Sequence, residues 1–301
     1  MRAFVAVSVA VLVAAGVAVA AVVKGDSEPK PRPAATARVD RFDADGAWKL
    51  VELQLTYGQR PAGSPQLRRL ATQLRHRLPA GRFEPIPGEP GLRNVVGTIP
   101  GKRPGLVIGA HYDTLVKPEG FIGANNGAAG SAIVVELGRA LRRLERPARA
   151  REIRLVLFDG EEPAAGLPEE SSDFYNEGLR GSRAYVKAHK DRTRAMVLLD
   201  YDGNRNLRLP REGSSTKELW DDVRAAARAV GVARTFPDDT QTSLLDDHTP
   251  FLREGIPAVD LIDWSYPGHD VSDTIDKLSR RSLDAVGEAM VELVRRMDRL
   301  G

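Results

Sequence analysis

The chain of 301 residues contains no cysteine. Disulfide bonds and thiolate metal sites are therefore excluded, and a metal ion can be bound only by histidine, carboxylate or amide side chains. Histidine is scarce, with 5 residues, so a histidine in a distinctive pattern is informative. The lack of cysteine does not identify the compartment, because an exported protein with a large core can fold without disulfides.

Several common catalytic and nucleotide-binding motifs are also absent. The sequence has no phosphate-binding loop, no dinucleotide fingerprint and no Gly-x-Ser-x-Gly turn. The net charge is only +3, and basic and acidic residues are interleaved along the chain, so we expect no nucleic-acid partner. With 42% hydrophobic and 28% charged residues, the composition is that of a globular protein.

One long apolar run lies at the amino terminus, where residues 3–23 carry no charge. Its length suits a membrane-spanning helix, which needs about 20 apolar residues, and also a secretory signal peptide. We predict a signal peptide or signal anchor at 1–23, a linker rich in proline and alanine at 24–40, and a folded domain at 41–301. The domain is expected outside the cytoplasm, either anchored to the membrane by the amino-terminal segment or secreted.

Within the predicted domain, strand-like and helix-like segments alternate, which is typical of a mostly parallel sheet covered by helices. The strands are apolar runs without alternation, as expected for strands buried on both faces. The expected helices are 43–57, 64–78, 130–144, 182–189, 217–230 and 281–299. The expected strands are 94–100, 105–110, 153–158, 195–199 and 258–262.

Acidic residues and histidines follow four of these strands, at or close to their carboxyl ends. They are His111, Asp113, Glu161, Glu162, Asp200 and His269. In open α/β sheets, ligands bind outside the carboxyl ends of the strands. Four strands that each deliver such residues to one edge of a sheet predict a polar functional site there.

The residue types suit a metal site with acid–base chemistry. His111 can bind a metal while Asp113 holds its second ring nitrogen. In the adjacent pair Glu161 and Glu162, one carboxylate can bind the ion and the other can move a proton. Each pattern also has an ordinary structural explanation: a histidine satisfied in a polar core, a solvated acidic turn, or an exposed strand end at Asp200.

Two further clusters precede the carboxyl-terminal helix. In Asp246, Asp247 and His248, the acids either anchor a loop through hydrogen bonds or contribute a carboxylate to a proton network with Glu161; we assign Asp247 to that network. His269 follows a Tyr-Pro-Gly sequence and is either a metal ligand or a surface histidine.

Five ordered segments, 107–114, 123–130, 158–162, 198–200 and 247–257, resemble metallopeptidase family twenty-eight, which includes zinc aminopeptidases and glutaminyl-peptide cyclotransferases. The resemblance covers roughly residue 43 to the carboxyl end and is closer to the cyclotransferase branch. It implies a three-layer α/β/α sandwich around a mixed, mostly parallel sheet.

The resemblance also implies roles for the site residues. His111 and Asp200 match the ligands of one zinc ion, and Glu162 and His269 match the ligands of the other. Glu161 matches the general base that activates water or takes a proton from the substrate amine.

The chain departs from the family pattern at Asn126, which replaces the aspartate that bridges the two metals. A neutral amide is a weaker ligand than a carboxylate, so we expect one zinc ion, with two still possible. Two tryptophans of the cyclotransferases are also absent, around Leu167 and at Gly268. Trp264 or Tyr266 is the candidate for rebuilding the aromatic wall around the substrate.

Three functions follow from these features. The first is a zinc-dependent glutaminyl-peptide cyclotransferase-like enzyme, and the second is a zinc aminopeptidase. The third is a metal-poor, non-catalytic binding domain, which Asn126 favours. The expected partners are peptide or protein amino termini, and the chain is expected to be a monomer.

Overall fold

The computed structural model describes residues 40–163 and 173–300. The predicted segment 1–23, the linker up to residue 39 and the neighbourhood of Leu167 lie outside these residues. Within the described ranges, no helix is both long enough and apolar enough to cross a membrane.

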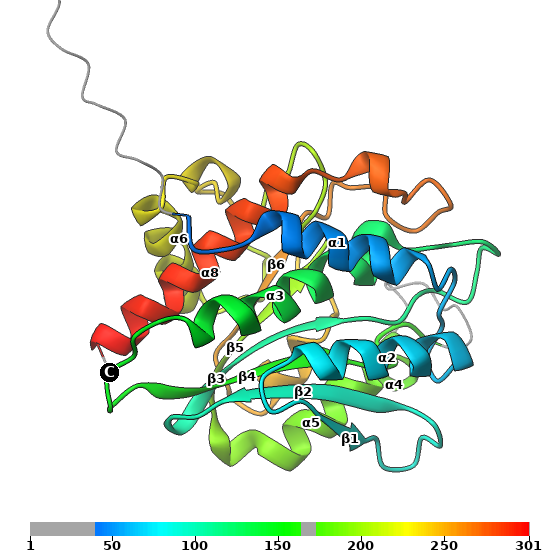
Figure 1. Cartoon of the computed structure of the whole chain (residues 1–301), viewed down its shortest axis with the longest axis horizontal. Helices are drawn as coiled ribbons and strands as arrows, with labels where there is room; N and C mark the ends of the chain where they lie inside the picture. The colour runs from blue at the N-terminus through cyan, green and yellow to red at the C-terminus, as the bar shows by residue number, and fades with distance from the viewer. Residues whose placement is uncertain (1–39, 164–172, 301) are drawn as a thin grey trace, which may run out of the picture. The chain divides into compact units, whose positions relative to one another are not determined.

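A mixed six-stranded sheet forms the centre of the described part (Figure 1). Its strands are β1 (Arg82–Pro85), β2 (Arg93–Ile99), β3 (Lys102–His111), β4 (Arg151–Phe158), β5 (Thr193–Asp200) and β6 (Ala258–Ile262). The spatial order is β1-β2-β4-β3-β5-β6. The strands β4, β3, β5 and β6 are parallel, whereas β1 and β2 pair antiparallel at one edge.

Helices connect and cover the strands. The α-helices are α1 (Ala44–Leu55), α2 (Pro65–Arg77), α3 (Gly130–Arg142), α4 (Phe174–Glu177), α5 (Arg180–His189), α6 (Lys217–Ala229), α7 (Thr249–Arg253) and α8 (Arg280–Leu300). Short helical segments are the π-helix η1 (Ala124–Ala129) and the 3-10 turns η2 (Lys190–Arg192), η3 (Ala233–Thr235) and η4 (Ile275–Lys277). The hydroxyl of Ser64 accepts a hydrogen bond from the backbone N–H of Leu67 and thereby begins α2.

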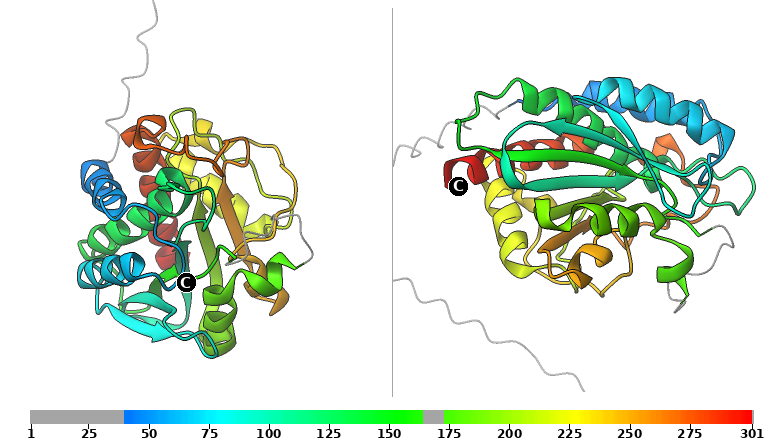
Figure 2. Two further views of the ribbon diagram at one scale, coloured as in Figure 1. Left: turned by 90° about the vertical axis from the view of Figure 1, so that its right-hand side faces the viewer. Right: turned by 90° about the horizontal axis from the view of Figure 1, so that it is seen from below.

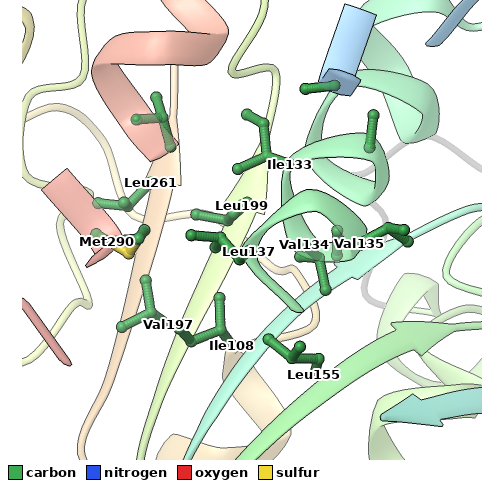
Figure 3. Packing of buried hydrophobic residues seen from close by; sticks show 14 of the residues in the cluster. Ile108, Ile133, Val134, Val135, Leu137, Leu155, Val197, Leu199, Leu261 and Met290 are labelled. Carbon is green, nitrogen blue, oxygen red and sulfur yellow. The ribbon is translucent and has the colours of Figure 1, made fainter. Parts of the chain in front are cut away.

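Alternate side chains of β3 enter two separate cores, because neighbouring residues of a strand point to opposite faces. Ile108 belongs to the larger core, which includes residues of α1, α2, α3, α6 and α8. Val107 belongs to the smaller core with residues of α5 and α7. Figure 2 shows helices on both faces of the sheet, and Figure 3 shows Leu137 of α3 between Leu199 of β5 and Ile108 of β3.

The predicted α/β/α sandwich with a mixed sheet is therefore confirmed, and each predicted strand and helix is present with small shifts at its ends. The antiparallel edge strand β1 and the short helices α4 and α7 were not predicted. β1 has four residues and ends in a proline, which removes a backbone donor, so its sequence gives no strand signal.

Candidate active site

The carboxyl ends of the parallel strands meet at one edge of the sheet, which we call the rim. β3 ends at His111, β5 ends at Asp200, and Glu161 and Glu162 follow β4. These four side chains are at most 8% exposed. The predicted convergence of residues from separate strands is thus present, and it places three carboxylates and an imidazole in a largely water-excluded environment.

The imidazole of His111 lies among three carboxylates. Its Nδ1 atom is 3.5 Å from Asp113 and 3.7 Å from Glu161, and its Nε2 atom is 3.4 Å from Asp200. Neither ring nitrogen makes a hydrogen bond within the described ranges. Although burial opposes the change, Asp113, Asp200 and Glu161 raise the pKa of His111 well above its usual value.

Asp113 also holds the turn that carries the glutamate pair. Its carboxylate accepts hydrogen bonds from the backbone N–H groups of Glu161, at 3.4 Å, and Glu162, at 3.2 Å. Burial and the adjacent Glu162 carboxylate raise the pKa of Glu161 well above its usual value. A carboxyl group with a raised pKa can both accept and return a proton near neutral pH.

Asn126 lies in η1, where the helix is kinked at Asn126 and Gly127. Gly127 has φ +86°, and a Cβ atom there would lie 2.6 Å from a backbone oxygen, so the kink requires glycine. The carboxylate of Asp273 accepts the backbone N–H of Asn126 at 2.9 Å. The side-chain amide of Asn126 donates to Oε1 of Glu162 at 2.9 Å. Asn126 therefore lies inside the site, as predicted.

Arg60, which sequence reasoning missed, holds the chain just before η1. Its guanidinium is fully buried and donates hydrogen bonds to the backbone oxygens of Ile122, at 2.5 Å, and Gly123, at 3.0 Å. Burial lowers the pKa of Arg60 to about 10, while Asp273 and Asp113 oppose the change. Arg60 is one of 44 basic residues, and only its burial in the folded chain distinguishes it.

A narrow pocket opens beside these side chains. Its polar lining residues are Asn126, Glu161, Glu162, Asp200, Asp246 and His269. Its other lining residues are Tyr201, Leu244, Leu245, Ile262 and Trp264. His269 is exposed, whereas the other polar lining residues are buried. We call His111, Asn126, Glu161, Glu162, Asp200 and His269 the rim cluster.

Tyr201 supplies an aromatic wall that sequence reasoning missed. Its backbone has φ +47°, and its ring stacks on Trp264 with centroids 6.3 Å apart and meets His269 edge-on at 5.7 Å. A Cβ atom on Gly268 would lie 2.6 Å from Cζ of Tyr201. The phenol ring therefore occupies the space beside Gly268. The only sequence signal was its position directly after Asp200.

The two predicted aromatic residues have different positions. Trp264 lines the pocket, which is where a substrate would contact it. The contact itself stays a prediction. Tyr266 does not line the pocket, and its hydroxyl donates to Asp273 at 2.7 Å. Tyr266 thus supports the carboxylate that holds the backbone of Asn126.

The aspartates before α7 lie behind the pocket. Asp246 lines it, whereas Asp247 is fully buried and does not. Burial raises the pKa of Asp247 to about 7. Both carboxylates contribute to the raised pKa of Glu161. The acid in contact with the pocket is thus Asp246, one residue before the aspartate we predicted.

The sequence profile of peptidase family M28 matches residues 94–294. The chain belongs to peptidase family M28. This match spans β2 to α8 and includes the whole rim cluster.

Family M28 relatives include glutaminyl-peptide cyclotransferases. The enzyme of Bothrops jararaca is 27% identical over 233 residues, which cover 65% of this chain and 63% of that protein. The chain thus spans slightly under two thirds of that curated relative. The crystal structure of an Acidobacteriales bacterium glutaminyl cyclase has a TM-score of 0.73 at 26% identity and covers 91% of this chain and 100% of the other.

The fold is shared more widely in the family. A leucine aminopeptidase precursor from Bacteroides thetaiotaomicron has a TM-score of 0.74 at 24% identity, covering 84% of this chain and 97% of the other. This similarity concerns the fold alone. Within family M28, then, the comparisons place the chain near the glutaminyl cyclases.

The rim cluster of this M28 chain fits a zinc ion by its donor chemistry. Zinc is bound in proteins by imidazole nitrogen and carboxylate oxygen, and these donors are present without any thiolate. One donor atom each of His111, Glu161 and Glu162 lie within 4.8 Å of one another. The ring nitrogens of His111 are buried and make no hydrogen bond with the described residues, as expected of groups that await a ligand.

Proposed function

We propose that this chain is a zinc-dependent, glutaminyl-peptide cyclotransferase-like enzyme that acts on peptide amino termini. In this reaction the α-amino nitrogen of an amino-terminal glutamine attacks the side-chain carbonyl carbon of the same residue. A carbon–nitrogen bond closes the ring, the bond to the side-chain nitrogen breaks, and ammonia leaves. The observation that carries the proposal is the buried Glu161 carboxyl, with its raised pKa, at the base of the narrow pocket.

Glu162 and His269, with the amide of Asn126, are the residues that would hold the catalytic zinc. When bound, zinc acts as a Lewis acid on the substrate carbonyl. Asn126 offers no negative charge, so the charge of the ion would be offset mainly by Glu162 and the neighbouring acids. We therefore propose one catalytic zinc ion rather than a two-metal centre.

Glu161 moves the proton in this proposal. It takes a proton from the attacking amine and returns it to the departing ammonia, so the reaction is balanced without an added acid. Its elevated pKa suits both transfers, because a general acid–base works best when its pKa is close to the operating pH. Asp113 positions Glu161 by accepting its backbone N–H.

The pocket is narrow in this conformation. Its cavity volume of about 10 Å³ is far below the roughly 300 Å³ at which ligand pockets begin, so a glutamine side chain would enter only if the lining side chains moved apart. Tyr201 and Trp264 form an apolar wall against which the methylene groups of a glutamine can pack. The exposed position of His269 marks the open side, where the rest of the peptide would leave the pocket.

Hydrolysis of amino-terminal residues is the second candidate. His111 and Asp200, whose nearest atoms are 3.4 Å apart, retain the ligand types of a second metal site, which the aminopeptidases of this family use. In that reaction Glu161 would activate a water molecule. Asn126 disfavours a two-metal site, and it is also the one feature that favours a third candidate, a non-catalytic binding domain.

A peptide panel distinguishes these candidates. The zinc-loaded chain is incubated with glutamine-led and leucine-led peptides, and free ammonia and free amino acids are measured separately. The proposal predicts ammonia from the glutamine-led peptide and no free leucine. Release of free leucine would establish the aminopeptidase alternative, and release of neither product would support a non-catalytic domain.

We further propose that the chain is exported and acts as a monomer on peptide or protein amino termini outside the cytoplasm. The proposal of export rests on the apolar run 3–23. Fractionation of cells that express the full chain tests it, and recovery of the intact chain in the cytoplasm would contradict it.

A further inference from the structure

A second group of polar side chains adjoins the rim cluster, and we call it the inner cluster. It consists of Glu212, Asp246, His248 and Asp260, none of which is more than 5% exposed. Glu212 precedes α6, Asp246 and His248 directly precede α7, and Asp260 is the middle residue of β6. Only Asp246 also lines the pocket beside the rim cluster.

His248 is held in one orientation by Glu212. Nε2 of His248 is 3.2 Å from Oε2 of Glu212 and 2.9 Å from the hydroxyl of Ser214. Glu212 also accepts the backbone N–H groups of Ser214 and Leu244, each at 2.9 Å. The hydroxyl of Ser214 donates to Glu212 at 2.9 Å and therefore accepts from Nε2 of His248. The ring proton thus stays on Nε2, and Nδ1 keeps its lone pair.

Nδ1 of His248 faces a carboxylate at a distance unsuited to a hydrogen bond. It is 3.8 Å from Oδ2 of Asp260, and neither atom has a hydrogen-bond partner among residues 40–163 and 173–300. Oδ1 of Asp260 and Oδ2 of Asp246 are likewise buried and have no hydrogen-bond partner among these residues. Buried polar atoms are nearly always paired, so four such atoms in one place indicate a missing ligand.

The spacing of these atoms suits a shared cation. One donor atom from each of Asp246, His248 and Asp260 lies within 4.8 Å of the other two. Donors bonded to one zinc ion at about 2.0–2.2 Å lie roughly 3–4 Å from one another. A small inward movement of these side chains would therefore complete three bonds.

Charge in the inner cluster leads to the same conclusion. The carboxylates of Asp246 and Asp260 are buried within 4.8 Å of one another, and two buried carboxylates are costly without a counter-charge. A divalent cation would offset both charges. The pairing of a carboxylate with the far nitrogen of a metal-binding histidine, as in Glu212 and His248, is common in zinc proteins.

We propose that Asp246, His248 and Asp260 form a second divalent-cation site, with zinc as the fitting ion. The ion would tie the start of α7 to the middle of β6. Because Asp246 also lines the pocket, the ion would fix the segment that forms its inner wall. With three protein ligands, a water molecule would take the fourth position, and the burial of all three keeps the ion away from the open side of the pocket.

The test separates the two sites by substitution and zinc analysis on the full chain. The protein is stripped with a chelator, reloaded with Zn²⁺, desalted and analysed for zinc. Glu162→Gln removes a rim ligand and leaves the inner cluster intact. The proposal predicts that this variant retains about one zinc ion per chain and that Zn²⁺ raises its Tm by roughly 5–10 °C at a hundredfold excess over Kd.

Adding Asp260→Asn to Glu162→Gln should remove both the retained zinc and the Tm shift. Asp263→Asn is the matched control: Asp263 is also buried, follows the same strand and has hydrogen bonds to Asn204 and Arg208, so the retained zinc should stay bound. If Glu162→Gln retains no zinc, or if Asp260→Asn leaves its zinc content unchanged, the proposal is wrong.

If the double variant does not fold, His111→Gln is added to Glu162→Gln in place of Asp260→Asn. This chain lacks the imidazole of the rim and keeps the inner cluster native, so loss of the retained zinc from it would overturn the proposal. The result is independent of the proposed function, which fails only if the zinc-loaded wild-type chain releases no ammonia from a glutamine-led peptide.

Discussion

The rim cluster and the inner cluster use the same side-chain types and differ in how their histidines are held. His248 has a carboxylate at one ring nitrogen and therefore presents the other nitrogen in a fixed orientation. His111 is surrounded by carboxylates at 3.4–3.7 Å and has no hydrogen bond to either nitrogen within the described ranges. Zinc sites in proteins also fall into two kinds: structural sites are closed, and catalytic sites keep one position open for water or substrate.

The surroundings of the two clusters extend this contrast. The rim cluster opens into a pocket with an aromatic wall, and one of its members, His269, is exposed. The inner cluster reaches that pocket only through Asp246. We conclude that connection to a pocket, rather than residue type, distinguishes a site for chemistry from a site for stability. The predictions below test this distinction.

Loss of metal from the rim should have the largest effect. Chelation, or Glu162→Gln, should reduce ammonia release from a glutamine-led peptide by at least about 10²-fold, because Lewis-acid stabilisation of the transition state is worth several kcal/mol. Re-addition of zinc should restore the chelated wild type and not the variant. Full activity in the Glu162→Gln chain would show that the rim cluster does not hold the catalytic zinc through Glu162.

Removal of the inner histidine should act mainly on stability. His248→Leu leaves Glu212 buried without its partner, and we expect the free energy of unfolding of the metal-free chain to fall by about 3 kcal/mol. Urea denaturation measures this, with His76→Gln as the control because His76 is exposed. A change below about 0.5 kcal/mol, as for a surface substitution, would show that the inner pair has no structural role.

A carboxylate at position 126 should strengthen zinc binding at the rim. Asn126→Asp replaces a neutral amide by a charged ligand beside Glu162, and we expect zinc affinity to rise by about tenfold. Competition with a chromophoric chelator gives the affinity. An unchanged affinity would mean that Asn126 is not a neighbour of the bound ion.

Disturbing the aromatic wall should have the smallest effect. Gly268→Ala places a Cβ atom against the ring of Tyr201, and we expect KM to rise by roughly threefold to tenfold with little change in kcat. Pro267→Ala, at an exposed neighbouring position, is the control. Equal kinetics for the two variants would show that Tyr201 does not contact the substrate.

The sequence predicted those parts of the fold and the site that depend on local patterns. The strands β3 to β6 are buried on both faces and therefore appear as apolar runs, and polar residues at their ends follow from the general geometry of parallel sheets. His111, Glu161 and Glu162 converge as expected for that reason.

Other features depend on contacts between distant segments and have no local signature. The wall formed by Tyr201 requires a left-handed backbone and the missing side chain at Gly268. The pairing of Glu212 with His248 joins residues 36 positions apart along the chain, so no motif could show it. The amide of Asn126 was visible as a departure from the family, but its hydrogen bond to Glu162 was not.

The central claim is that Glu161 moves the proton in ring closure, and one comparison tests it most directly. Ammonia release from a glutamine-led peptide is measured for the zinc-loaded wild type and for Glu161→Gln, with zinc content and Tm determined for both. Our account predicts ammonia release by the wild type and a fall of about 10²–10⁴-fold in kcat for the variant, with its zinc and Tm retained. Equal rates, or no ammonia release by the zinc-loaded wild type, would contradict it.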